Sequence, residues 1–123
     1  MTDLLSWGLV LFVLCLPAGF WLLKIGKPYQ TGIINLHKLI ALGSAVLMLY
    51  SLYMRSREGD SLVPLITFFI GGIMLVILSF ASGALISIGK PAPRAMTIAH
   101  RISAGLACVA MAYILYLRIN GLI

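Results

Sequence analysis

The chain contains two histidines, His37 and His100, and each lies within an apolar segment. An ionisable side chain in such a segment is costly to place in a membrane, so both are candidate functional residues. Imidazole can ligate a metal through one ring nitrogen while the other nitrogen donates a hydrogen bond. Two imidazoles on opposite sides of a planar macrocycle complete a six-coordinate haem iron, so the pair predicts a bis-histidine haem site.

The composition predicts that a membrane surrounds these histidines. Of the 123 residues, 62% are hydrophobic and only 10% are charged, whereas soluble domains are about 45–50% apolar and about 25% charged. A spanning helix uses about 20 residues, so four spans would use about 80 and leave only short connections. This arithmetic excludes a separate soluble catalytic domain, a dinucleotide-binding fold and a nucleic-acid-binding module.

Four apolar runs are long enough to span a membrane as helices, in which the backbone satisfies its own hydrogen bonds. We expect helices over about 4–23, 33–54, 64–88 and 96–117. The first run lacks the basic start of a secretory signal, so we expect it to be retained, with a kink at Pro17. The predicted fold class is an all-α membrane protein, a four-transmembrane-helix bundle in a single membrane domain, 1–123.

The net charge of +6 is concentrated on one predicted side of the membrane. On the side with the first and third connections, every charged residue is basic: Lys24, Lys27, Lys38, Lys90, Arg94 and Arg101. The opposite side balances its arginines against Asp3, Glu58 and Asp60. Because short loops rich in Lys and Arg stay in the cytoplasm, we expect an integral protein of the prokaryotic cytoplasmic (inner) membrane with both termini outside.

An internal repeat relates the two halves of the chain. Shifting the sequence by 63 residues without gaps aligns Gly26-Lys27-Pro28 with Gly89-Lys90-Pro91, and aligns His37 with His100. Each half would form a two-helix hairpin that enters the membrane in the same direction. We therefore expect two tandem parallel repeats, 1–60 and 64–123, related by a pseudo-twofold axis along the membrane normal.

The repeated identities predict where a haem would lie. They fall on one face of the second helix and of the fourth: His37, Ala41, Met48, Leu52 and Arg55, then His100, Ala104, Met111, Leu115 and Arg118. We expect the two faces to meet, with the ring between them. Ala41 and Ala104 would pack against the ring, although small residues also serve ordinary helix packing. Basic residues would hold the haem propionates, although the positive-inside rule alone would place them there: Lys27, Lys38, Lys90, Arg94 and Arg101.

These features resemble the b-type membrane cytochromes, and in particular the four-helix core shared by ascorbate-dependent and bacterial diheme b cytochromes. The resemblance covers the four-helix layout and the two histidines, His37 and His100. It implies one haem b, electron transfer, and other membrane or redox subunits as partners, with quinone as a further candidate. The chain departs from the diheme pattern because it has no second histidine pair. Electron transfer across the membrane would therefore need quinone, a partner subunit or a second copy.

Three alternatives stay open. The first is a small four-helix transporter, although the three acidic residues all lie at ends or loops and only a histidine could carry protons within the membrane. The second is a non-redox structural subunit whose histidines form hydrogen bonds. The third is a Zn or Cu ion bound by the histidines, which would require further ligands. We interpret Cys15 and Cys108 as packing residues without a ligand role, and the short loops favour an electron-transfer subunit over an autonomous enzyme.

Overall fold

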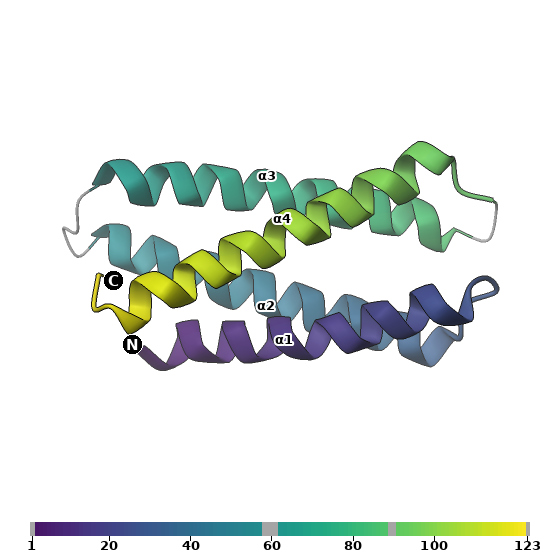
Figure 1. Cartoon of the computed structure of the whole chain (residues 1–123), viewed down its shortest axis with the longest axis horizontal. Coiled ribbons are helices and arrows are strands. Elements are labelled where there is room, and N and C mark those ends of the chain that lie inside the picture. Colours follow the sequence, from purple (N-terminus) through teal and green to yellow (C-terminus); the bar gives the residue numbers. More distant parts are fainter. Residues whose placement is uncertain (1, 58–61, 89–90, 123) are drawn as a thin grey trace. The chain divides into compact units, whose positions relative to one another are not determined.

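The computed structural model describes residues 2–57, 62–88 and 91–122, with side chains described from Leu4 onward except at Ser56 and 62–68 (Figure 1). Within these residues the chain is all-helical: α1 (Thr2–Ile25), α2 (Thr31–Arg57), α3 (Leu62–Ser87) and α4 (Arg94–Ile119). The predicted helices are confirmed. Most ends extend slightly past the apolar runs, because polar residues at a helix end still continue its backbone hydrogen bonding, while α3 ends one residue early, at Ser87.

Each helix contains a segment that is long and apolar enough to cross a membrane: Leu4–Ile25, Thr31–Arg55, Phe69–Ser87 and Arg94–Ile119. Large apolar side chains project outward from these segments, including Phe20 at 71% exposure, Leu39 at 68% and Val109 at 68%. A soluble monomer rarely exposes contiguous apolar surface on this scale. The surface of the helices therefore matches a lipid bilayer as the surrounding medium.

Glycines in the left-handed conformation end two of the helices. Gly26 has a φ of 71°, and its N–H donates to the carbonyl of Leu22, which closes the last turn of α1. Gly121 has a φ of 66°, and Leu122 N–H donates to the carbonyl of Leu117. This is the Schellman arrangement, and it ends α4 just past the predicted limit of about 117. α1 continues through Pro17, which lies inside the helix.

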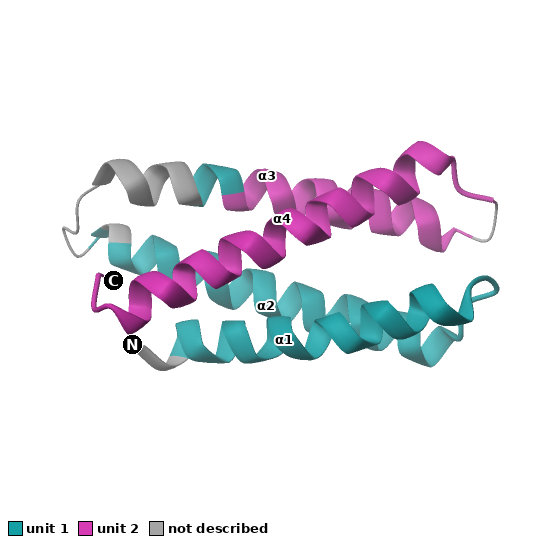
Figure 2. Cartoon of the chain, viewed as in Figure 1, with its two compact units in different colours: residues 1–71 teal, residues 72–123 magenta. Residues whose placement is uncertain are grey.

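The chain divides into two compact units, coloured separately in Figure 2. Unit 1, Met1–Gly71, holds α1, α2 and the beginning of α3, and unit 2, Gly72–Ile123, holds the remainder of α3 with α4. The division falls between two adjacent glycines inside α3, whereas the predicted repeats are 1–60 and 64–123. The bundle of four helices and its pseudo-twofold axis stay predictions.

In unit 1, a small-residue contact brings α1 and α2 together. The Ser44 hydroxyl, 2% exposed, donates a 2.9 Å hydrogen bond to the carbonyl of Gly8. A Cβ on Gly8 would lie 2.9 Å from Sδ of Met48, so the two helices approach closely at this point. Leu5, Met48 and Leu52 complete the buried layer. Close approach at small residues with an interhelical hydrogen bond is a usual way for helices to associate in lipid.

This contact leads to a stability prediction. Ser44→Ala removes the interhelical hydrogen bond and is expected to lower the free energy of unfolding by about 0.6 kcal/mol, with about 1.7 kcal/mol as the upper limit. Ser51→Ala is the matched control, since the Ser51 hydroxyl donates within its own helix, to the carbonyl of Leu47. Unfolding in mixed micelles with increasing SDS measures both variants. Equal losses for the two variants would contradict the prediction.

Candidate functional site

Both histidines stand at the same place in their helices. His37 lies six residues after Thr31, the first residue of α2, and His100 lies six residues after Arg94, the first residue of α4. At a rise of 1.5 Å per residue, each lies about 9 Å into its helix. Both side chains are half-buried. Each imidazole is therefore held inside its unit, near the end where the connecting loop enters the helix.

In unit 1, the imidazole of His37 lies against α1. Its Nδ1 is 3.3 Å from the carbonyl oxygen of Cys15 and 3.3 Å from the Cys15 Sγ. The Cys15 thiol in turn lies 3.8 Å from the carbonyl oxygen of His37, to which it can donate. One turn further along α1, a Cβ on Gly19 would lie only 2.9 Å from Cε1 of the ring. The glycine thus leaves the space that the imidazole occupies.

In unit 2, the imidazole of His100 lies against α3 in the same way. Its Nδ1 is 3.0 Å from the carbonyl oxygen of Ser79 and 3.2 Å from the Ser82 hydroxyl. A Cβ on Gly83 would lie 3.1 Å from Cε1 of the ring. In each unit, therefore, the carbonyl that contacts Nδ1 comes four residues before the glycine that receives the ring.

Serine side chains extend the polar contacts in unit 2. The Ser79 hydroxyl donates a 2.9 Å hydrogen bond to the hydroxyl of Ser103, which donates to the carbonyl of His100 at 3.0 Å. Ser103 is fully buried, at 0% exposure. The carbonyl of His100 is therefore linked to α3 through the two hydroxyls. Satisfied polar contacts of this kind restrict the orientation of a side chain in a low-dielectric interior.

Sequence reasoning missed the residues that hold the rings. The sequence predicts a packing role alone for Cys15, yet its sulfur and its carbonyl both contact His37. The ungapped shift paired Gly19 with Ser82, but the structure gives Gly19 and Gly83 the same position against a histidine. These two glycines are 64 residues apart, whereas the histidines are 63 apart. A one-residue gap between the paired helices would have aligned the glycines and revealed the contact.

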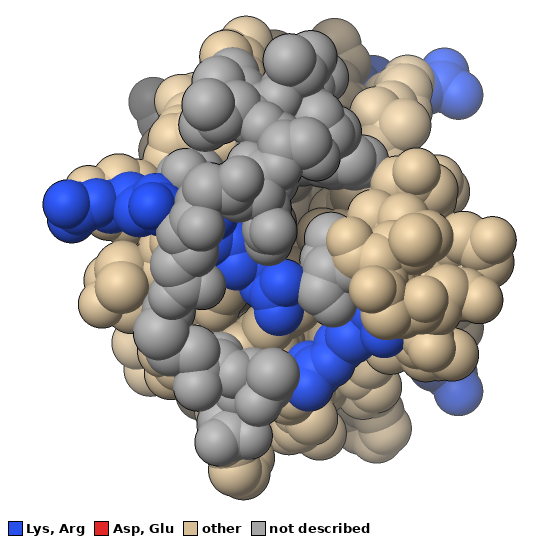
Figure 3. Space-filling view, turned by 90° about the vertical axis from the view of Figure 1, so that its left-hand side faces the viewer, with Lys and Arg blue, Asp and Glu red and all other residues tan. Residues whose placement is uncertain are grey.

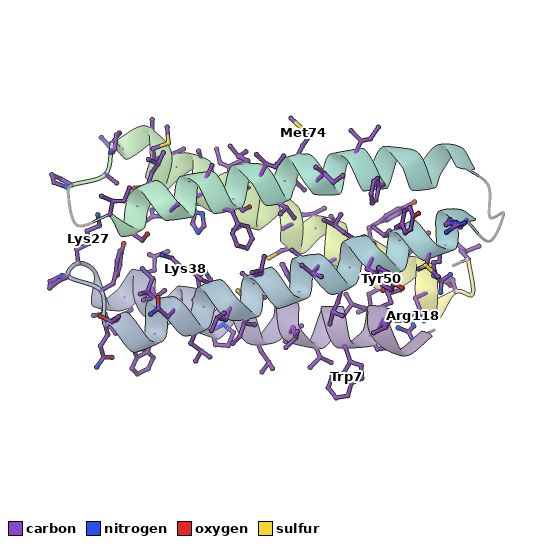
Figure 4. The ribbon with its side chains drawn as sticks, turned by 180° about the vertical axis from the view of Figure 1, so that it is seen from behind. Trp7, Lys27, Lys38, Tyr50, Met74 and Arg118 are labelled. Atoms are coloured by element: carbon purple, nitrogen blue, oxygen red, sulfur yellow. The ribbon has the colours of Figure 1, made fainter. Side chains whose placement is uncertain are left out.

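The basic residues predicted to hold propionates are distributed over both units. In unit 1, Lys27 and Lys38 are exposed and lie toward the same end of the unit (Figure 4). Lys27 Nζ also lies 5.9 Å from the centre of the Tyr29 ring. In unit 2, Arg94 and Arg101 are exposed on α4, on either side of His100 in the sequence. Lys90 lies outside the described residues.

The opposite end of unit 1 carries aromatic side chains. Trp7, 60% exposed, points away from α1, and Tyr50 lies on α2 toward the same end (Figure 4). Arg57, the last residue of α2, is exposed, and Figure 3 shows Lys and Arg side chains in blue beside residues of other types in tan. Aromatic rings near one end of a helix pair match a membrane–water interface.

The alanines predicted to pack against a ring differ in exposure. Ala41 is half-buried in unit 1, and Ala104 is exposed in unit 2. Two further members of the predicted face, His37 and Met48, contact glycines of α1 within their own unit. The meeting of the α2 face with the α4 face concerns the two units together and stays a prediction. Among the described residues, no group of three or more His, Cys, Asp or Glu side chains could hold a metal ion.

No protein family matches the chain, and no curated protein or solved structure is significantly similar to it. The function is therefore argued from the residues and contacts described above.

Proposed function

We propose that the chain is an electron-transfer membrane subunit that carries one b-type haem, with His37 and His100 as the two axial ligands. The observation that supports the proposal is the matched environment of the two histidines. Each half-buried imidazole contacts a backbone carbonyl through Nδ1 and lies against a glycine of the preceding helix. A metal-ligating histidine usually donates a hydrogen bond from its other ring N–H to an acceptor such as a backbone carbonyl.

The two histidines suit a haem better than they suit a metal ion that is ligated by protein side chains alone. A structural Zn site takes four ligands from Cys, His, Asp or Glu. A haem supplies four nitrogen ligands itself and requires only two from the protein. The chain offers two histidines in equivalent surroundings, which is the number that a six-coordinate haem requires.

The proposed arrangement places the two units as parallel repeats around the haem, with α2 and α4 adjacent. In this arrangement His37 and His100 would stand at equal depth, because each lies six residues into its helix. The exposed Lys27, Lys38 and Arg101, with Lys90 and Arg94, would hold the propionates at the basic membrane side. Ala41 and Ala104, one turn beyond the histidines, would leave room for the ring.

The haem supplies reversible one-electron chemistry when bound, and the chain's own residues set its conditions. The Nδ1 contacts orient the two imidazoles. The apolar helices would exclude water from a bound haem, and the basic residues would favour its reduced form. Because both histidines would lie near one membrane side in this arrangement, the proposed partners are a redox carrier or a larger respiratory or photosynthetic complex at that side. Quinone is the lipid-soluble candidate.

The absorption spectrum of the purified chain tests the proposal. Protein expressed with added haem precursor and purified in mild detergent is expected to show a Soret band, with sharp α and β bands after dithionite reduction. The pyridine haemochrome assay is expected to give one haem b per chain. Colourless protein after such expression would contradict the proposal, and proton-linked flux by that protein in liposomes would favour the transporter alternative.

A further inference from the structure

We propose that Gly19 and Gly83 are positioning residues, which together with the carbonyls of Cys15 and Ser79 hold both histidines in the neutral Nδ1–H tautomer. Nε2 is then the nitrogen that ligates the metal. The ligating role rests on the proposed haem function. The tautomer depends only on contacts within each unit and can be measured without any haem.

The contacts of His100 determine its tautomer. The carbonyl oxygen of Ser79, 3.0 Å from Nδ1, can only accept a hydrogen bond. The Ser82 hydroxyl, 3.2 Å from Nδ1, donates its own hydrogen bond to the carbonyl of Leu78 at 2.6 Å. Its lone pairs are therefore left to face the ring. Both neighbours of Nδ1 are acceptors, so Nδ1 must carry the proton.

The same reasoning applies to His37. The carbonyl oxygen of Cys15, 3.3 Å from Nδ1, is again an acceptor only. The Cys15 thiol has its donor directed to the carbonyl of His37, which leaves a sulfur lone pair toward Nδ1. An unprotonated Nδ1 would set its lone pair against the carbonyl oxygen. A doubly protonated ring would place a charge within an apolar segment, which is costly in a membrane.

The glycines make these hydrogen bonds geometrically accessible. A Cβ at Gly19 would lie 2.9 Å from Cε1 and 3.4 Å from Nδ1 of His37. A Cβ at Gly83 would lie 3.1 Å from Cε1 and 3.4 Å from Nδ1 of His100. An imidazole is rigid and cannot yield at its tip as a methionine does. A methyl group at either position therefore displaces the ring from its carbonyl.

The two sites differ in the second acceptor that each ring contacts. His100 has a serine hydroxyl at 3.2 Å, and His37 has a thiol sulfur, which accepts hydrogen bonds only weakly. A stronger acceptor on Nδ1–H increases the basicity of a ligating imidazole. Ser82→Ala is therefore expected to raise the midpoint potential of the haem while leaving the tautomer of His100 unchanged.

Nitrogen-15 NMR of the haem-free chain in detergent tests the tautomer. Two variants, His37→Gln and His100→Gln, each leave one histidine for assignment in chains labelled at the imidazole nitrogens. Each remaining histidine is expected to show a protonated Nδ1 and an unprotonated Nε2. Protonation at Nε2, alone or together with Nδ1, would overturn the assignment.

Glycine substitutions test the positioning role. Gly19→Ala and Gly83→Ala are expected to move the nitrogen signals of His37 and His100 respectively, and to weaken haem binding by about 10- to 100-fold. Gly32→Ala and Gly105→Ala are the controls in the same units, because a Cβ at either position meets nothing within 4 Å. If Gly19→Ala does not fold, Gly83→Ala still decides the question. Test variants that behave like their controls would overturn the proposal.

The outcomes separate this inference from the haem function. Nδ1–H histidines in a chain that takes up no haem would retain the tautomer and reject the ligating role. A bis-histidine spectrum combined with Nε2–H histidines in the haem-free chain would retain the haem function and reject the positioning role.

Discussion

Replacing either His37 or His100 with alanine is expected to abolish the whole bis-histidine haem spectrum. One haem shared by the two histidines loses its low-spin, six-coordinate state when either ligand is removed. Each single variant should therefore fall to background at the reduced α band, and the double variant should show no further loss. Reduced-minus-oxidised spectra, normalised to protein concentration, provide the measurement.

A control on the same helix separates loss of a ligand from loss of fold. Asn35 is an exposed polar residue of α2, two positions from His37, and Asn35→Ala is expected to keep the full spectrum. Circular dichroism would establish that all variants retain their helices. If each histidine variant instead kept half of the spectrum, the chain would hold separate haem sites, and the shared site would be wrong.

Topology reporters are expected to give an all-or-none result. Alkaline phosphatase is active only outside the bacterial cytoplasm, so a fusion at the C terminus should be active and a fusion after Tyr29 inactive. Green fluorescent protein at the same positions should give the opposite pattern. The physical reason is the retention of short Lys- and Arg-rich loops in the cytoplasm, here the connection that carries Lys27.

Charge removal provides the control for this topology. Lys24→Gln with Lys27→Gln weakens the basic bias of the first connection, so a part of the molecules should insert in the reverse orientation. Arg55→Gln with Arg57→Gln removes the same charge from the opposite end and should leave the orientation unchanged. Alkaline phosphatase activity after Tyr29 in the parent chain would contradict the prediction and would place both histidines near the outer face.

The helices could be predicted from the sequence because their cause is local. Continuous apolar runs of spanning length must form helices in lipid, where no other partner can satisfy the backbone. The end of α4 was also predictable, since Asn120-Gly121 supplies a residue that adopts a positive φ at low cost. The limits of the helices were less predictable, because polar residues can extend a helix after the apolar run has ended.

The sequence also identified the two histidines, because an ionisable residue inside an apolar run requires an explanation. It did not identify Gly19, Gly83, Cys15 or Ser82 as their neighbours. Hydropathy cannot distinguish a glycine that receives an imidazole from a glycine that faces lipid. That distinction depends on the rotation and axial offset of one helix against the next.

The sequence by itself therefore determined the all-helical membrane class and the two candidate ligands, and it predicted a basic side of the membrane. Only the tertiary structure decided that each histidine lies against a glycine of the preceding helix, with Nδ1 at the carbonyl of Cys15 or Ser79. Helix formation follows from the solvent acting on each segment alone. The contacts of a ring follow from the packing of two segments. If one helix shifts by one residue along the other, the ring meets a different carbonyl.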